Sequence, residues 1–281
     1  MLIGLTWSST AKPQQLTHLG PIIFETESTY SSIRVRKKGS VNTLIFVRDS
    51  GREVGETQID LKHPERLLIP YTRSMFASYL FRPDPRRVLI VGLGGGAMVH
   101  FLRHHAPTVI IDAVEIDPTV VAIADRFFSM QADTNTTIHT QDAFDFFTTP
   151  KHQYDVIFMD AFLKPTSQTD TTGAPTRLKT QDFLRSLEPH LTPDGVVVFN
   201  LNHHNALRND VQTIRSAFQQ THVFRVPKSR NLIVVARLKN DPITRSTLRK
   251  RGRSLDHRFE AGFSFQALAR MLTPTPSTLR P

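Results

Sequence analysis

The sequence contains no cysteine. This absence excludes a disulfide-stabilised scaffold, a thiol nucleophile and a zinc site with cysteine ligands. Long apolar runs are also missing, because no stretch approaches the roughly 18 consecutive apolar residues that a membrane helix requires. The apolar start from Met1 to Trp7 lacks the basic region and the length of a secretory signal. We therefore expect a soluble, cytoplasmic protein.

Positive charge is in excess, but it is unevenly distributed. The 281 residues carry a formal net charge of +10, which favours an anionic partner such as nucleic acid. Residues 239–281 hold nine basic and three acidic residues, so this segment carries a net +6 and the rest of the chain only +4. Contact with nucleic acid is therefore expected only through this basic tail. Its run Arg249-Lys-Arg-Gly-Arg253 could contact phosphate or be simply solvated.

Apolar patterning predicts four parts along the chain. We expect an N-terminal extension over residues 1–21, a β-hairpin domain over 22–75, an α/β domain over 76–238 and a basic, partly disordered tail over 239–281. Turns at Lys38-Gly39 and Asp49-Ser-Gly51 separate strand-like segments and predict an antiparallel unit. After Arg86, apolar strands alternate with helical patterns, which predicts a doubly wound sheet of parallel strands.

A glycine-rich turn is the first sign of a ligand site. Gly92-Leu-Gly-Gly-Gly-Ala97 follows an apolar strand and precedes a helical pattern, as in G-x-G-x-x-[GA]. Small residues there allow a ligand to approach the backbone closely. Glu115 ends the next predicted strand, where a carboxylate can accept hydrogen bonds from both ribose hydroxyls. Together these features predict nucleoside binding, with NAD and S-adenosylmethionine both open.

Two further acids favour S-adenosylmethionine. Asp142 follows the third predicted strand, where it could accept a hydrogen bond from an adenine amino group, and Asp160 ends the fourth strand and is expected to face the cleft. Acids after the first four strands resemble the class I S-adenosylmethionine-dependent methyltransferase fold more than a dehydrogenase. Asp155 precedes its apolar run, so we interpret it as a surface acid at a strand start.

Longer motifs resemble one enzyme family. They are Tyr71-Thr-Arg-Ser-Met75, Arg86-Arg-Val-Leu-Ile-Val-Gly-Leu-Gly-Gly-Gly-Ala97, Val114-Glu-Ile-Asp-Pro118, Asp160-Ala-Phe162 and Leu191-Thr-Pro-Asp-Gly-Val196. With the upstream β unit, these segments resemble the spermidine/spermine synthase (polyamine aminopropyltransferase) family, in its bacterial spermidine synthase-like branch. The resemblance covers roughly residues 24–238.

The resemblance implies a fold, a reaction and a set of site residues. It implies a Rossmann-like catalytic domain behind a small antiparallel β domain, and a homodimer. An aminopropyl group would pass from decarboxylated S-adenosylmethionine, a co-substrate, to a small amine such as putrescine, with no prosthetic group and no metal. Gly92, Gly94, Gly95 and Glu115 would bind the donor, with Asp142 and Ala143 at its adenine. Asp160 would be the catalytic aspartate, and Tyr71 would contact the acceptor.

Three departures from the family pattern affect the amine half of the site. Gly95 stands where the family has an aspartate that holds the aminopropyl chain of the donor. Leu163, followed by Lys164, stands where the family has a second acid for the diamine, and Thr72 and Arg73 replace polar and acidic partners beside Tyr71. Arg73 or Lys164 would repel a dication if either faced the cleft. Asn200 and Asn202 follow a strand end and either line the cleft or form a turn.

Three functions are therefore open from the sequence. The first is aminopropyl transfer to a polyamine. The second is methyl transfer on the same fold with intact S-adenosylmethionine as donor, which the loss of the aspartate at Gly95 favours. The third is a non-catalytic nucleoside- or RNA-binding protein that uses the basic tail.

Overall fold

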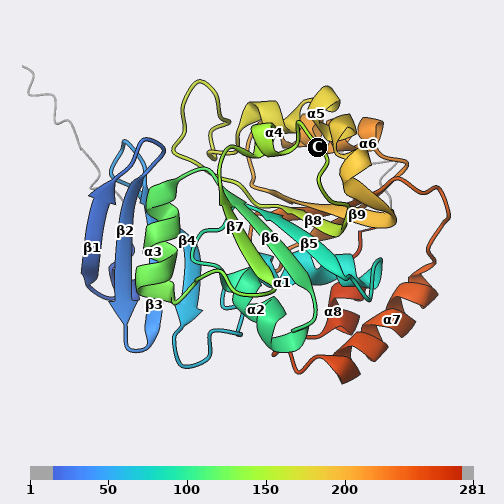
Figure 1. The fold of residues 1–281 in the computed structure, drawn as a ribbon, viewed down its shortest axis with the longest axis horizontal. Helices are drawn as coiled ribbons and strands as arrows, with labels where there is room; N and C mark the ends of the chain where they lie inside the picture. Colours follow the sequence, from blue (N-terminus) through green and yellow to red (C-terminus); the bar gives the residue numbers. More distant parts are fainter. Residues whose placement is uncertain (1–14, 274–281) are drawn as a thin grey trace, which may run out of the picture.

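The computed structural model describes residues 15–273, and these residues form two β-sheets side by side (Figure 1). The first sheet is antiparallel, with its four strands in sequence order. It confirms the antiparallel unit that the turns at Lys38-Gly39 and Asp49-Ser-Gly51 predict. Its strands are β1 (Ile22–Glu27), β2 (Ser32–Lys38), β3 (Val41–Val47) and β4 (Glu53–Asp60).

The second sheet is the α/β sheet and has the order β10-β11-β9-β8-β5-β6-β7. Strands β5 to β9 run parallel, as the alternation of strands and helices predicts. Its strands are β5 (Arg87–Val91), β6 (Ile110–Glu115), β7 (Thr136–Thr140), β8 (Tyr154–Met159), β9 (Leu191–Leu201), β10 (Gln220–Arg225) and β11 (Leu232–Arg237).

One edge of this sheet differs from the all-parallel expectation. Strand β11 pairs antiparallel with β9, and β10 pairs antiparallel with β11. Only the turn 226–231 joins β10 to β11, and so short a connection permits a hairpin but no helical crossover. Strand β10 has the sequence Gln-Thr-His-Val-Phe-Arg and lies at the sheet edge, so it lacks the apolar run that predicts a buried strand.

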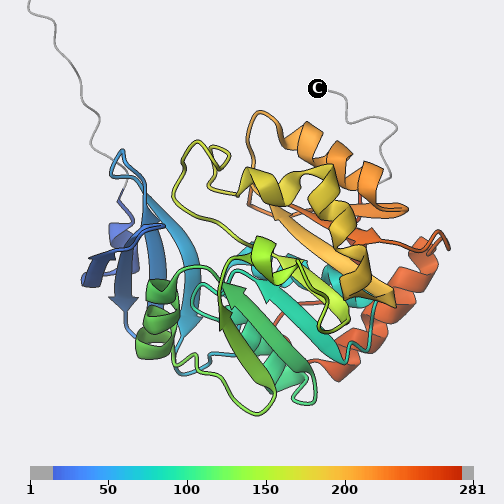
Figure 2. The same cartoon turned by 45° about the horizontal axis from the view of Figure 1, so that its top comes forward.

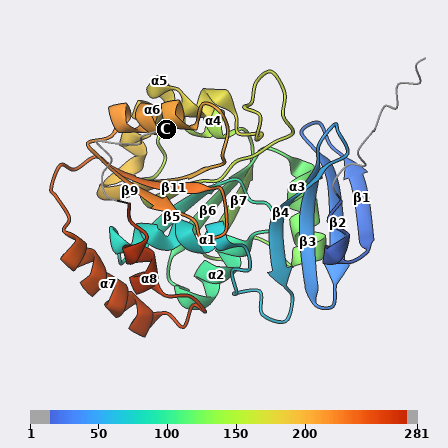
Figure 3. The same ribbon diagram turned by 180° about the vertical axis from the view of Figure 1, so that it is seen from behind.

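Helices cover both faces of the α/β sheet, and alternate side chains of each strand supply the two cores. In β5, Val88 and Ile90 join the core that packs against α2, α3, α7 and α8, whereas Leu89 and Val91 join the core beneath α5 and α6. Figures 1 and 3 show these two layers. The helices are α1 (Pro70–Met75), α2 (Ala97–His105), α3 (Pro118–Phe128), α4 (Ala143–Phe146), α5 (Gln181–Ser186), α6 (Leu207–Ala217), α7 (Arg245–Arg258) and α8 (Phe265–Arg270).

The described part of the expected tail, residues 239–273, contains two helices. Helix α7 buries Leu248, Gly252 and Leu255 in the main core, and α8 buries Phe265 and Leu268. The dense positive charge of α7 hides this apolar stripe, because one face of the helix is buried and the charged face is exposed. The domain boundaries themselves stay a prediction, and residues 1–14 and 274–281 lie outside the described chain.

Two arginines of α7 also attach this segment to the body of the protein. The guanidinium of Arg251 donates to the backbone carbonyl of Leu80 at 2.9 Å, and Arg258 forms an ion pair with Asp84. Leu80 ends the short 3₁₀ helix η2 (Phe76–Leu80) that follows α1. Within residues 15–273, no helix combines the length and the apolar character that crossing a bilayer demands.

If α8 is part of the main core, Phe265→Ala should strongly destabilise the protein. Phe265 is fully buried against the rings of Tyr79, Phe259 and Phe263. We expect the free energy of unfolding, measured by urea titration, to fall by about 3–5 kcal/mol. The exposed Arg270 on the same helix is the matched control, and Arg270→Ala should change it by less than about 0.5 kcal/mol. A loss below about 1 kcal/mol for Phe265→Ala would contradict this description of the core.

Candidate functional site

A cavity of about 650 Å³ lies at the carboxyl ends of the parallel strands, where open α/β sheets bind their ligands. Its walls come from the loops after β5, β6, β7 and β8, from β4 and α1, and from the long connection between β8 and α5. That connection is visible beyond the strand ends in Figure 2. Both sheets therefore contribute to one cavity. Of the residues predicted for the site, it is lined by Tyr71, Gly92, Gly94, Glu115, Asp142, Ala143 and Asp160.

The glycine-rich turn lies between β5 and α2, as its sequence predicts. Gly92, Gly94 and Gly96 have positive φ, so a side chain there would strain the backbone. Gly95 is the predicted site residue that is not in the cavity wall. Its N–H donates to the Thr57 hydroxyl at 3.0 Å, and an added Cβ would lie 2.9 Å from Thr57 Cγ2. A larger residue at position 95 therefore requires the Thr57 side chain to shift.

Glu115 ends β6 and is held by the backbone of the neighbouring turns. Its Oε2 accepts a hydrogen bond from the Leu93 N–H at 3.0 Å, and its Oε1 accepts one from the Asp117 N–H at 3.0 Å. Burial raises the pKa of Glu115, while these two hydrogen bonds lower it. Each oxygen keeps a second lone pair, so the carboxylate can still accept hydrogen bonds from a diol in the cavity.

Asp142 precedes α4, and Ala143 is the first residue of that helix. Asp142 Oδ1 caps the helix by accepting from the Phe144 N–H at 2.8 Å. Its Oδ2 forms an ion pair with the guanidinium of Arg177, whose Cζ lies 4.9 Å from the centroid of the Phe144 ring. Arg177 is a lining residue that the sequence did not single out, and it lies beside Asp142, where an adenine is predicted.

Asp160 follows β8 and is bonded from two sides. Its Oδ1 accepts a hydrogen bond from the Asn200 amide of β9 at 2.8 Å, and its Oδ2 accepts one from the Tyr71 hydroxyl of α1 at 3.2 Å. Burial raises the pKa of Asp160 to about 7, although both hydrogen bonds lower it. Asn231 in turn donates to Asn200 and Asn202, so these asparagines lie behind Asp160 and do not line the cavity. A carboxylate with such a pKa can take up a proton near neutral pH.

Glu56 is a cavity acid that sequence reasoning missed. In the pairing of β3 with β4, Leu44 lies opposite Thr57 and Ile45 opposite Gly55, so Glu56 is the extra residue of a β-bulge. Glu56 lines the cavity with Asp160, and its backbone carbonyl accepts a 3.4 Å hydrogen bond from the Tyr71 hydroxyl. Burial raises the pKa of Glu56 to about 7. Gly55 was the available signal, because a glycine inside a strand pattern often marks a bulge.

The two cations that could repel an amine do not present free charge to the cavity. Arg73 donates to the backbone carbonyls of Leu67 and Leu68 and is not in the cavity wall. Lys164 does line the cavity, but its ammonium forms a 2.5 Å ion pair with Asp49 at the surface. Leu163 adds only apolar surface.

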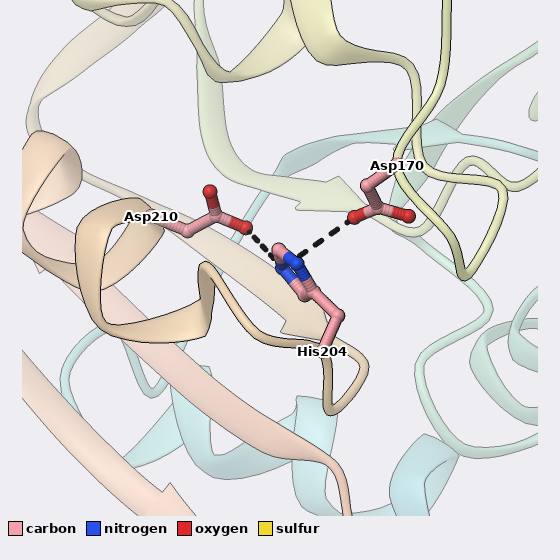
Figure 4. A group of neighbouring side chains, drawn as sticks. All are labelled: Asp170, His204 and Asp210. Atoms are coloured by element: carbon pink, nitrogen blue, oxygen red, sulfur yellow. Dashed lines mark hydrogen bonds and ion pairs between the residues drawn. The ribbon is translucent and has the colours of Figure 1, made fainter. Parts of the chain in front are cut away.

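The connection between β8 and α5 is fastened at two places. Arg48 donates to the carbonyls of Leu163 and Thr172 at 3.0 and 2.9 Å. At the other place, Asp170 approaches His204 and Asp210 near the start of α6 (Figure 4). Within the described chain, these three side chains lie close enough together that their oxygen and nitrogen atoms could hold a metal ion. Lys179 forms ion pairs with both carboxylates, so a cationic side chain already lies beside them and we interpret the group as an ion-pair cluster.

Asp155 differs from the expected surface acid. It is buried at the start of β8, where it forms an ion pair with Arg82 and accepts hydrogen bonds from the backbone N–H groups of Arg86 and Arg87. Its role is to fix the strand start, and it lies outside the cavity wall.

Comparisons with known proteins agree with this arrangement. A family model described as the spermine/spermidine synthase domain matches residues 71–236. A polyamine aminopropyltransferase of Vibrio vulnificus (strain CMCP6) is 33% identical over 226 residues, which are 79% of this chain and 73% of that protein. The eEF1A lysine and N-terminal methyltransferase of Mus musculus is 32% identical over 169 residues, 57% of this chain but 24% of that protein.

A solved structure gives the same picture for the fold. The spermidine synthase from Thermotoga maritima superposes with a TM-score of 0.66 at 19% identity, over 91% of this chain and 84% of that one. At this identity the likeness concerns the fold alone, and it confirms the predicted methyltransferase-like α/β fold with its N-terminal antiparallel sheet. The family model and the Vibrio relative are evidence of relatedness in sequence as well as in fold. They show that the chain belongs to the spermine/spermidine synthase family.

Proposed function

We propose that this chain transfers an aminopropyl group from decarboxylated S-adenosylmethionine to a primary amine such as putrescine. One observation carries the proposal: a single cavity joins the Glu115 and Asp142 carboxylates to Asp160, an acid whose pKa is raised to about 7. The first two acids suit a nucleoside, and the third suits an amine that must lose a proton. The polyamine aminopropyltransferases among the relatives support the same reaction.

The donor would lie along the loops after β5, β6 and β7. Glu115 would accept hydrogen bonds from the ribose hydroxyls, and the turn at Gly92 and Gly94 would let the nucleoside approach the backbone. Asp142 would accept from the adenine amino group beside Ala143, and Arg177 would cover the base. The sulfonium and its propyl chain would then point toward Asp160.

In the transfer step, the amine nitrogen attacks the propyl carbon bonded to the sulfonium. A C–N bond forms, and the C–S bond breaks with its electron pair kept by sulfur, which leaves as the thioether of 5′-methylthioadenosine. The nitrogen passes its proton to Asp160, whose carboxylate also holds the amine in line before attack. Tyr71 and Asn200 orient that carboxylate through their hydrogen bonds.

Methyl transfer from intact S-adenosylmethionine is the second candidate. It is favoured by Gly95, which leaves the turn without an acid, and by the eEF1A methyltransferase relatives. Against it, the intact donor carries an additional carboxylate, which would enter a cavity that already holds Asp160 and Glu56.

The proposal also includes two kinds of binding partner, a second copy of this chain and, as a lesser alternative, nucleic acid. We infer a homodimer from the family resemblance. Nucleic acid stays a lesser alternative that would use the exposed cations Arg249, Lys250 and Arg253 of α7. Truncation after Leu238 cannot test it, because the cut would also remove buried core residues. Reversing the charges of Arg249, Lys250 and Arg253 tests it instead, because these exposed side chains lie outside the core.

The choice of donor is the first test. Isothermal titration calorimetry should show decarboxylated S-adenosylmethionine binding at least about tenfold more tightly than the intact form, since only the intact form adds a carboxylate beside buried acids. Tighter binding of the intact form would contradict aminopropyl transfer and favour methyl transfer.

The role of Asp160 is tested by Asp160→Asn. An amide keeps the shape and can still bond to Asn200 or Tyr71, but it cannot accept a proton. We expect kcat to fall by about 10²–10⁴-fold, while the affinity for 5′-methylthioadenosine changes less than about twofold. The exposed Asp145→Asn on α4 is the control and should leave both quantities unchanged. Unchanged turnover in Asp160→Asn would refute its role as the base.

The raised pKa predicts how activity depends on pH. Asp160 must be ionised to accept a proton, and its pKa of about 7 means that it is mostly protonated below this pH. The value of kcat/KM should therefore rise from pH 5.5 to about pH 7.5, with a limb whose apparent pKa belongs to Asp160 and Glu56 together. A profile that is flat between pH 5.5 and 7.5 would contradict the assignment.

A further inference from the structure

Glu56 is a half-buried acid that forms no ion pair in the described chain. Its Oε1 is shielded from solvent and accepts no hydrogen bond from the described residues. Glu53, three residues earlier on β4, shows the contrast, because its carboxylate forms ion pairs with Arg34 and Arg36. The same strand thus gives one acid two guanidinium partners and leaves the other acid facing the cavity. An unpaired buried carboxylate is costly, and in a cavity it suits a cationic ligand.

The charged groups around Glu56 leave one negative charge unbalanced. Arg48 is the positive group that acts on Glu56, but its guanidinium is bonded to the carbonyls of Leu163 and Thr172 and forms no ion pair in the described structure. Asp160 acts on Glu56 as a second negative charge. With both acids ionised and Arg48 charged, this part of the cavity carries one net negative charge. One bound ammonium ion would neutralise it.

The bulge explains why Glu56 lies at the wall of the same cavity as Asp160. Tyr71 bridges them, since its hydroxyl contacts the Asp160 carboxylate at 3.2 Å and the Glu56 backbone carbonyl at 3.4 Å. Thr57, the next residue, bonds to the Gly95 N–H and fixes β4 against the glycine-rich turn. The Tyr71 hydroxyl therefore links the Asp160 carboxylate to the backbone of Glu56. Both residues line one cavity, and the charge of Asp160 acts on the carboxylate of Glu56.

We propose that Glu56 is a specificity-determining residue that binds, together with Asp160, the protonated nitrogen of the acceptor amine that reacts. The proposal deepens the proposed function and rests on it for the nature of the acceptor. It assigns the second acceptor carboxylate to the N-terminal sheet rather than to the connection after β8, where Leu163 is apolar. Glu56 would hold the ammonium, and Asp160 would take its proton.

Amine binding to the full chain saturated with 5′-methylthioadenosine tests this proposal. The probes are putrescine and n-butylamine, which share one chain length but carry two amines and one. For Glu56→Gln, we expect the dissociation constants of both probes to rise by about tenfold or more, because a charged hydrogen-bond partner is lost. Glu56→Asp should recover part of the affinity. The exposed Glu27→Gln on β1 removes the same charge outside the cavity and should change neither value.

Three results would overturn the assignment. They are unchanged amine binding in Glu56→Gln, a loss confined to putrescine (which would place Glu56 at the distal amine), and no binding of either probe to the unaltered chain. The variant should fold, since removing an uncompensated buried charge should leave its melting temperature at pH 8 equal or higher. If the unaltered chain binds both amines but transfers no aminopropyl group, the proposed function fails while the ammonium site stands.

Discussion

The structure depends on keeping two half-buried carboxylates without an ion-pair partner at the wall of one cavity. Elsewhere in the described chain, three buried acids have guanidinium partners: Glu53 pairs with Arg36, Asp155 with Arg82 and Asp112 with Arg87. Glu115 has none but accepts two backbone N–H hydrogen bonds. Asp160 and Glu56 form no such pair there, and burial raises the pKa of each to about 7. Between about pH 4 and pH 7 the folded state therefore binds more protons than the unfolded state, so ionising these acids lowers stability as the pH rises. That cost is explained if a cationic ligand is the missing partner.

The N-terminal sheet is part of the site because it supplies Glu56 and supports the neighbouring turn. Thr57 bonds to the glycine-rich turn, Arg48 holds the connection after β8, and Asn42 donates to the carbonyl of Phe127 at the end of α3. The cavity therefore exists only when both sheets are folded against each other. Helices α7 and α8 pack into the main core on one face of the α/β sheet. The positively charged segment therefore stabilises the fold and also presents exposed cations.

Features that depend on short stretches of chain could be predicted from the sequence. Glu115, Asp142 and Asp160 each follow an apolar strand, and the strand order brings those ends to one edge of the sheet, so their meeting in one cavity was expected. Glu56 was missed because a bulge depends on the register between β3 and β4, and Gly55 gives only an indirect local sign of it. Asp155 was placed at the surface because its partner Arg82 lies 73 residues away. Helix α7 looked like a solvated tail because its many cations obscure three buried positions.

We expect the cavity to hold an acid that is still protonated near neutral pH. Carbon-13 NMR titration of the side-chain carboxyl groups tests it most directly, on the unliganded protein and on Asp160→Asn and Glu56→Gln. We predict that carboxyl signals of the unaltered protein titrate near pH 7, well above ordinary aspartate and glutamate values, and that one such signal is lost in each variant. Titration of every carboxyl group below about pH 5 would contradict it.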